Sequence, residues 1–236
     1  KIWVFGGSTS NRGFCDSVNI SWVDLLKKNL NNISNFSRNG VYSDYSLKVL
    51  LSQLQKNNPP KIIIWANKVN ELRFAKLNSN KNITYNIKSL NLTFKRIFVS
   101  YYLLDEMLLR ISQKIGIKPL INKETEAEED LINSAENFYN NTKKAIKISQ
   151  SYNVSNFYVV SIFNNYNLKN DETKFYKFYI DKVKKLTNEF NVSFIDTKKY
   201  LNNDQKKLKL FCDPMHQTLL GKEITAQIIF KKLNEH

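Results

Sequence analysis

Strand-like runs alternate with longer amphipathic segments along this chain, and the alternation restricts the possible folds more than any other feature. Residues 1–6, 32–40, 61–67, 156–164 and 192–197 have the length and composition of strands. The segments that follow them carry apolar residues at helical spacing, over residues 16–30, 44–58, 126–152, 172–190 and 217–236. About five such alternations predict an α/β fold with a mainly parallel sheet.

The third run, KIIIWAN, is apolar almost without interruption, which is typical of a strand covered on both faces. The sequence therefore predicts three layers, α/β/α, around a flavodoxin-like sheet of about five strands. A length of 236 residues with 42% hydrophobic residues suits one domain over residues 1–236. Residues 72–121 break the alternation, and we expect them to form a helical insertion after the third strand.

The formal net charge of +15 raises the question of nucleic-acid binding, because basic surfaces attract phosphates. The lysines are spread along the whole chain among asparagines, as in LKKNLNN and NNDQKKLKL. The sequence has neither an RNP-like aromatic motif nor the spacing of a zinc knuckle. We therefore expect no nucleic-acid partner, while attraction to anionic glycans or lipid head groups stays open.

The two cysteines, Cys15 and Cys212, are too few for a disulfide framework and too far apart for a CxxC zinc site. They could pair, but we expect free thiols. One interior histidine and no acidic cluster predict no metal and no cofactor. No apolar run reaches 18 residues, so the sequence predicts no membrane span. Residue 1 opens almost directly on a strand, so an upstream leader or membrane anchor stays open.

Polar groups follow several of the predicted strands at the point where each strand ends. Ser8, Gly40, Asn70 and the loop at residues 213–216 are in such positions. Because working residues in parallel sheets sit on loops at the carboxyl ends of strands, we expect these four segments to meet at one edge of the sheet.

The stretch GGSTSNRG around Ser8 fits none of the common glycine-rich motifs. It has no lysine where a phosphate-binding loop needs one, it fails the dinucleotide spacing, and it is not a GxSxG elbow. A plain turn and a seat for a serine nucleophile both stay open. A serine nucleophile needs a base with a pKa near neutrality, usually histidine.

His216 is the candidate base, because the other histidine, His236, ends the chain. Asp213 lies three positions before His216, so its carboxylate could reach Nδ1 of the ring and leave Nε2 free for a serine proton. The alternative is that Asp213 caps the last helix and His216 merely lies on its first turn.

Taken together and in order, FGGSTS, RNGVYSDYS, NKVNEL and DPMH resemble the four motifs of the SGNH/GDSL hydrolase family. The resemblance spans the chain except for the insertion. It implies a triad of Ser8, His216 and Asp213. It also implies an oxyanion hole formed by the backbone N–H of Ser8, that of Gly40 or Ser43, and the side-chain amide of Asn70.

The match has departures from the family pattern. Lys68 and Glu71 replace the glycine and aspartate of the third motif. If Ser43, and not Gly40, stands at the usual glycine position of the second motif, the backbone there loses some freedom to take positive φ. We expect Lys68 either to bias the site towards acidic substrates or to point to solvent.

The family resemblance implies a serine hydrolase that cleaves an O-acyl or O-acetyl ester of a carbohydrate, or a short-chain acyl ester. An O-acyltransferase acting on a surface polysaccharide with the same triad is an alternative, and a catalytically degenerate binding module is another. The expected partner is a small-molecule or glycan ester. Because many family members act on envelope glycans, the cell envelope is favoured over the cytoplasm.

Overall fold

The computed structural model describes residues 1–12, 15, 19–68, 128–164, 174–213 and 215–235. Within them a five-stranded sheet has the order β2-β1-β3-β4-β5, and every neighbouring pair is parallel. The strands are β1 (Ile2–Gly6), β2 (Ile33–Asn35), β3 (Ile62–Ala66), β4 (Asn156–Ser161) and β5 (Ser193–Asp196). The predicted parallel α/β sheet is confirmed, and its order is that of flavodoxin-like folds.

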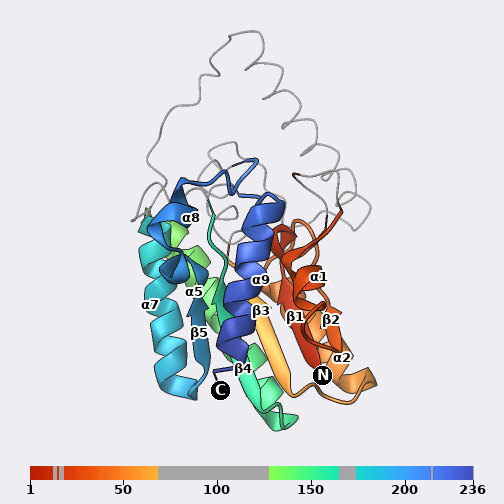
Figure 1. The fold of residues 1–236 in the computed structure, drawn as a ribbon. Coiled ribbons are helices and arrows are strands. Elements are labelled where there is room, and N and C mark those ends of the chain that lie inside the picture. Colours follow the sequence, from red (N-terminus) through yellow and green to blue (C-terminus); the bar gives the residue numbers. More distant parts are fainter. Residues whose placement is uncertain (13–14, 16–18, 69–127, 165–173, 214, 236) are drawn as a thin grey trace, which may run out of the picture.

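Helices cover both faces of the sheet (Figure 1). On one face lie α2 (Ser43–Lys56), α5 (Glu128–Ser151) and α7 (Lys174–Phe190), and on the other lie α1 (Trp22–Leu26) and α9 (Leu219–Leu233). Short helical turns complete the described chain: η1 (Ser8–Ser10), η2 (Thr197–Tyr200) and α8 (Asn203–Lys207). The predicted insertion at residues 72–121 lies outside the described residues.

The apolar runs of β1 and β3 supply both cores, which explains their lack of alternation. Trp3, Phe5 and Trp65 are buried against α2, α5 and α7, whereas Val4 and Ile64 are buried against α1 and α9. Since successive side chains point to opposite faces of a sheet, a strand between two helical layers must be apolar at every position.

The first predicted helix is shorter than expected. Residues 16–30 suggested a helix, but α1 covers only Trp22–Leu26. A capping box begins it: the Ser21 side chain accepts from the Asp24 N–H, and the Asp24 carboxylate accepts from the Ser21 N–H. This reciprocal cap satisfies backbone donors that would otherwise have no partner at the helix start, and so it defines that start.

The chain leaves β1 through a tight turn that depends on Gly6. A Cβ atom at Gly6 would lie 2.8 Å from Ser10 Oγ and 3.0 Å from the Ala66 carbonyl oxygen. The absence of a side chain therefore lets η1 fold back onto the ends of β1 and β3, which brings Ser8 to the carboxyl edge of the sheet.

Candidate active site

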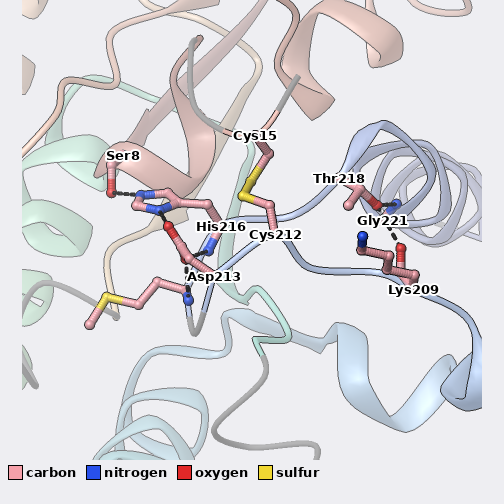
Figure 2. The surroundings of a disulfide bond; sticks show 9 residues. Ser8, Cys15, Lys209, Cys212, Asp213, His216, Thr218 and Gly221 are labelled. Atoms are coloured by element: carbon pink, nitrogen blue, oxygen red, sulfur yellow. Dashed lines mark hydrogen bonds and ion pairs between the residues drawn. A yellow bond between two sulfur atoms is a disulfide. The ribbon is translucent and has the colours of Figure 1, made fainter. Parts of the chain in front are cut away.

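Ser8, His216 and Asp213 form a chain of hydrogen-bonding contacts at this edge (Figure 2). Ser8 Oγ lies 3.2 Å from His216 Nε2, although the two residues are 208 positions apart. His216 Nδ1 lies 2.5 Å from Asp213 Oδ2. The structure thus brings the three predicted residues together, and their catalytic roles remain a prediction.

Asp213 organises the turn that carries the histidine. Its Oδ1 accepts from the backbone N–H of Met215 at 2.7 Å and of His216 at 2.6 Å, while its Oδ2 contacts the ring. The N-cap of α9 is Thr218, whose side chain accepts from the Gly221 N–H. The alternative that Asp213 caps the last helix is therefore wrong.

The surroundings of Asp213 favour its ionised form. Burial alone would raise the pKa of this carboxyl group, but hydrogen bonds from the His216 ring and from two backbone N–H groups outweigh burial and lower it. An ionised carboxylate only accepts hydrogen bonds, so Nδ1 of His216 donates to it. In the neutral ring Nε2 then carries a lone pair, directed at the Ser8 hydroxyl.

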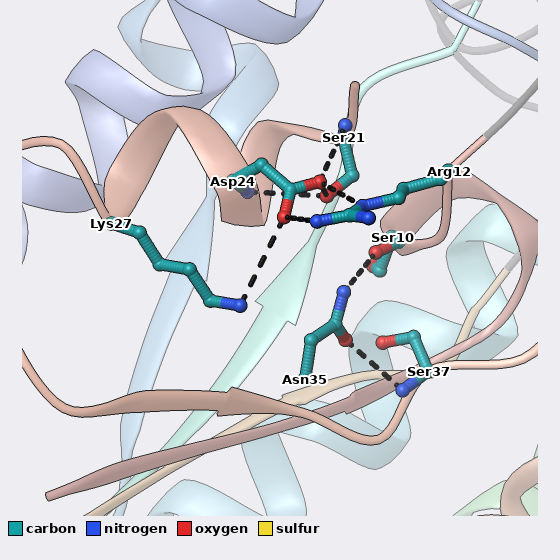
Figure 3. A network of polar contacts seen from close by, with 7 residues as sticks. All are labelled: Ser10, Arg12, Ser21, Asp24, Lys27, Asn35 and Ser37. Atoms are coloured by element: carbon teal, nitrogen blue, oxygen red, sulfur yellow. Dashed lines mark hydrogen bonds and ion pairs between the residues drawn. The ribbon is translucent and has the colours of Figure 1, made fainter. Parts of the chain in front are cut away.

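Polar contacts anchor the turn that carries Ser8 (Figure 3). The buried Ser10 hydroxyl accepts from the indole N–H of Trp22 at 3.2 Å, and the Ser10 carbonyl accepts from Asn35 Nδ2 at 3.0 Å. Asn11 Nδ2 also donates to Asn39 Oδ1 at 3.0 Å. The turn that carries Ser8 is therefore tied to α1, to β2 and to the loop after β2.

A bidentate ion pair secures the chain just beyond this turn. Arg12 Nε and a terminal nitrogen of Arg12 lie 3.0 and 2.8 Å from the two carboxylate oxygens of Asp24 (Figure 3). Burial would raise the pKa of Asp24, but hydrogen bonds from Arg12 and Ser21 lower it well below its ordinary value. Paired donors in the rigid guanidinium fork give such contacts a defined geometry.

The turn that carries His216 is anchored to other elements than the turn that carries Ser8. Phe211 and Gln217 form an antiparallel bridge, and the Cys212 N–H donates to the His216 carbonyl oxygen at 3.1 Å, so residues 211–217 form a closed hairpin. The buried Gln217 amide donates to the Phe163 carbonyl oxygen at 3.1 Å and to Thr225 Oγ1 at 2.9 Å. These contacts attach the hairpin to the end of β4 and to α9.

The structure describes only some of the residues predicted for the oxyanion hole. Gly40 is exposed and has a φ of +69°, a left-handed conformation that favours glycine. Ser43 is buried at the first position of α2, and its hydroxyl accepts from Asn141 Nδ2 at 3.1 Å. Ser43 is not among the described residues with positive φ, so serine is unstrained there. Asn70 lies outside the described residues.

Lys68 does not point to solvent, which was one of the two expectations for it. It follows β3, it is only 5% exposed, and its ammonium group donates to Ser161 Oγ at 2.8 Å and to the Ile162 carbonyl oxygen at 2.9 Å. Nζ also lies 5.4 and 6.0 Å from the ring centroids of Tyr176 and Tyr179. The ammonium is turned into the protein and away from solvent, where it ties the end of β3 to the end of β4.

Burial lowers the pKa of Lys68 to about 8, an effect that Asp196 partly offsets and Lys198 reinforces. Below pH 8 the folded state carries a buried charge at a cost. As the pH rises from 8 towards 10.5, the unfolded chain binds more protons than the folded one, so stability rises. Over this range we expect the free energy of unfolding of wild type to rise by about 2–3 kcal/mol relative to that of Lys68→Met.

Urea unfolding of both proteins at pH 7.5 and pH 10 measures this gain, and Lys48→Met on the exposed face of α2 controls for the loss of one positive charge. Equal changes of the unfolding midpoint in wild type and Lys68→Met would contradict the expected cost of burying the charge.

The expectation of free thiols is wrong. Cys15 and Cys212 form a disulfide with a Cα–Cα distance of 5.3 Å, directly beside the histidine turn (Figure 2). Cys212 precedes Asp213, and Cys15 is seven positions after Ser8. If the loops after Ser8 and before Asp213 meet, their cysteines are neighbours, so this pairing could have been inferred from the predicted triad.

In the described part of the chain, no three His, Cys, Asp or Glu side chains gather as a group that could hold a metal ion. None of the described helices is long and apolar enough to cross a membrane.

No protein-family model matches the sequence, and no curated protein matches it either. Its structure nevertheless resembles solved structures of SGNH/GDSL lipolytic proteins. A member of the lipolytic G-D-S-L family from Veillonella parvula superposes with a TM-score of 0.61 at 11% identity, over 100% of this chain and 98% of that chain.

Two further neighbours agree. A variant of an acetyl-xylooligosaccharide esterase from Geobacillus Stearmophilus has a TM-score of 0.59 at 13% identity, over 98% of this chain and 93% of that one. A GDSL-like lipase from Bacteroides thetaiotaomicron has a TM-score of 0.57 at 10% identity, over 99% and 87%. At such identities the likeness shows the fold, which is the SGNH/GDSL α/β fold.

Proposed function

We propose that this protein is a serine hydrolase that cleaves ester bonds. The observation that carries the proposal is the continuous contact from Ser8 Oγ through both ring nitrogens of His216 to the Asp213 carboxylate. Three polar groups from the two ends of a chain, aligned at the carboxyl edge of a parallel sheet, are what acyl transfer through a serine requires.

In the proposed mechanism Ser8 Oγ attacks the ester carbonyl while Nε2 of His216 takes the hydroxyl proton. The Asp213 carboxylate orients the ring and stabilises the imidazolium that forms. His216 then gives the proton to the departing alcohol, which leaves an acyl group on Ser8. Water, activated by the same ring, releases the acid and restores the serine.

The negative charge on the carbonyl oxygen needs donors in place before the reaction. We propose the backbone N–H of Ser8, that of Gly40 or Ser43, and the amide of Asn70 for this role. The segment that carries Gly40 is linked to the Ser8 turn by the Asn11–Asn39 contact. Donors aimed at the developing oxyanion commonly contribute more to the rate than other single groups.

Asn70→Ala is expected to lower kcat by roughly 10²–10³-fold with little change in KM, because the amide would act on the oxyanion only in the transition state. Steady-state kinetics with p-nitrophenyl acetate measures both constants. An unaltered kcat would remove Asn70 from the oxyanion hole.

For the substrate we propose an acetyl or other short acyl ester of a carbohydrate, in line with the acetyl-xylooligosaccharide esterase among the structural neighbours. An O-acyltransferase would differ only in its acceptor, a sugar hydroxyl in place of water. Product analysis with and without a glycan acceptor separates the two activities, because only a transferase forms an acylated glycan.

Labelling with a fluorophosphonate probe tests the proposal without knowledge of the substrate. The probe should modify wild type at Ser8, identified by peptide mass spectrometry, because only a serine with an adjacent base reacts quickly. Ser8→Ala and His216→Gln should lose the label. Equal labelling of wild type and His216→Gln, or modification of another serine, would refute the proposal that this protein is a serine hydrolase with Ser8 as its nucleophile.

A further inference from the structure

We propose that the Cys15–Cys212 disulfide positions the catalytic base, so that its reduction switches off the site while the domain stays folded. This inference rests on the proposed function. It concerns what fixes the position of the turn that carries Ser8 relative to the hairpin at residues 211–217. The contacts among Ser8, His216 and Asp213 do not fix this position by themselves.

The disulfide joins the two loops that carry the reacting groups. Cys15 follows the turn that contains Ser8, and Cys212 lies inside the closed hairpin, next to Asp213. The Cys212 N–H donates to the carbonyl oxygen of His216 at 3.1 Å. The disulfide is therefore connected directly to the backbone of His216, the proposed base. Figure 2 shows the sulfur bridge close to the Ser8–His216 contact.

Each loop is otherwise anchored to a different part of the fold. The Ser8 turn is fastened to α1 and β2 by Ser10, Asn35 and the Arg12–Asp24 pair. The hairpin is fastened to β4 and α9 by Gln217. These separate anchors should keep both loops folded after reduction, so the bond is needed mainly for their relative position.

A single hydrogen bond between Ser8 and His216, with a donor–acceptor distance of 3.2 Å, is a weak constraint on the relative position of two loops. Cys15 has a φ of +82°, a left-handed conformation that is uncommon for a residue with a side chain. Breaking the bond would let that backbone relax, and a shift of about 1 Å between reacting groups can cost about 10²-fold in rate.

Cys212 is exposed, so a dithiol can reach the bond. One thiolate of the reductant attacks Cys212 Sγ and forms a mixed disulfide, and Cys15 leaves as a thiolate that takes up a proton. The second thiol of the reductant then displaces Cys212 and closes the reductant's own disulfide. Two electrons and two protons pass to the protein, which ends with two thiols.

This arrangement suits an enzyme that works in an oxidising compartment, such as a cell envelope, because disulfides persist there and are rare in the reducing cytosol. The same site would be inactive in a reducing environment and become active once the bond forms.

The test compares oxidised wild type, wild type treated with dithiothreitol, and Cys15→Ser/Cys212→Ser. With p-nitrophenyl acetate, at a temperature where circular dichroism shows all three folded, we expect kcat to fall roughly 10- to 100-fold in the last two and KM to stay within about twofold. The double variant should not respond to dithiothreitol, because the chain has no other cysteine.

A variant with lowered stability separates positioning from a general loss of stability. Val183→Ala removes a fully buried contact on α7, in the core on the opposite face of the sheet from α9. It should lower the melting temperature and leave kcat unchanged. A kcat in the reduced protein that differs from that of oxidised wild type by less than twofold would overturn the proposal, and so would an equal loss in Val183→Ala.

A second measurement does not depend on turnover. Diethyl pyrocarbonate attacks the free Nε2 of histidine, so reduction should speed the modification of His216, followed by mass spectrometry, as the ring leaves Ser8. An unchanged modification rate counts against the positioning role. If oxidised wild type shows no turnover that depends on Ser8, the proposed hydrolase function is refuted. The rate of His216 modification alone then decides whether the disulfide positions the ring.

Discussion

Ser8→Ala is expected to lower kcat for p-nitrophenyl acetate by about 10⁶-fold. The exchange removes the oxygen that we propose as the nucleophile, so the proposed acyl intermediate could not form. The fold should persist, because the Ser8 side chain belongs to none of the hydrophobic cores and the turn is held by Ser10 and Gly6.

Thr9→Ala is the matched control, because it removes a hydroxyl group from the same turn. Its kcat should stay within about threefold of wild type, as expected of a substitution outside the reacting groups. Circular dichroism and thermal unfolding of both variants show whether the fold is retained. Turnover by Ser8→Ala above about one hundredth of the wild-type rate would show that another group is the nucleophile.

Asp213→Asn is expected to lower kcat by about 10⁴-fold. An asparagine oxygen can still accept from the Met215 and His216 backbone N–H groups, so the hairpin keeps its turn. The amide NH₂ then faces Nδ1 and donates to it. This contact favours the tautomer with the proton on Nε2, which cannot accept the Ser8 proton.

Steady-state kinetics of Asp213→Asn and Asp213→Ala separates the two functions of this side chain. The alanine variant should lose both the tautomer control and the turn, and therefore also unfold at lower temperature. Asp181→Asn, on the exposed side of α7, controls for the loss of one negative charge. A loss of less than tenfold in Asp213→Asn would mean that the carboxylate does not orient the base.

Most of the fold could be predicted because the apolar pattern has a direct physical cause. The strands β1 and β3 are apolar at every position since helices pack on both faces, and this composition identifies central parallel strands without coordinates. The start of α1 was less predictable, because the Ser21–Asp24 capping box, and not the apolar periodicity, determines it.

The candidate site was predictable in part for a similar reason. In a parallel sheet the carboxyl ends of the strands share one edge, so loops distant in sequence must meet there. The prediction that residues 213–216 directly follow a strand is wrong, because η2 and α8 lie between β5 and this loop. For Ser8 at the end of β1 the prediction is confirmed, and there the reason is the strand-end rule. It says nothing about the direction of a side chain, which is why the burial of Lys68 against Ser161 was not anticipated.

The sequence by itself determined the layer architecture and the place of Ser8 at the end of the first strand. These properties depend on periodicity and local spacing. Only the tertiary structure decided that Cys15 bonds to Cys212 and that the Lys68 ammonium is buried. Both outcomes depend on distances of a few ångströms between segments far apart in the chain, and those distances are set by packing of the whole domain.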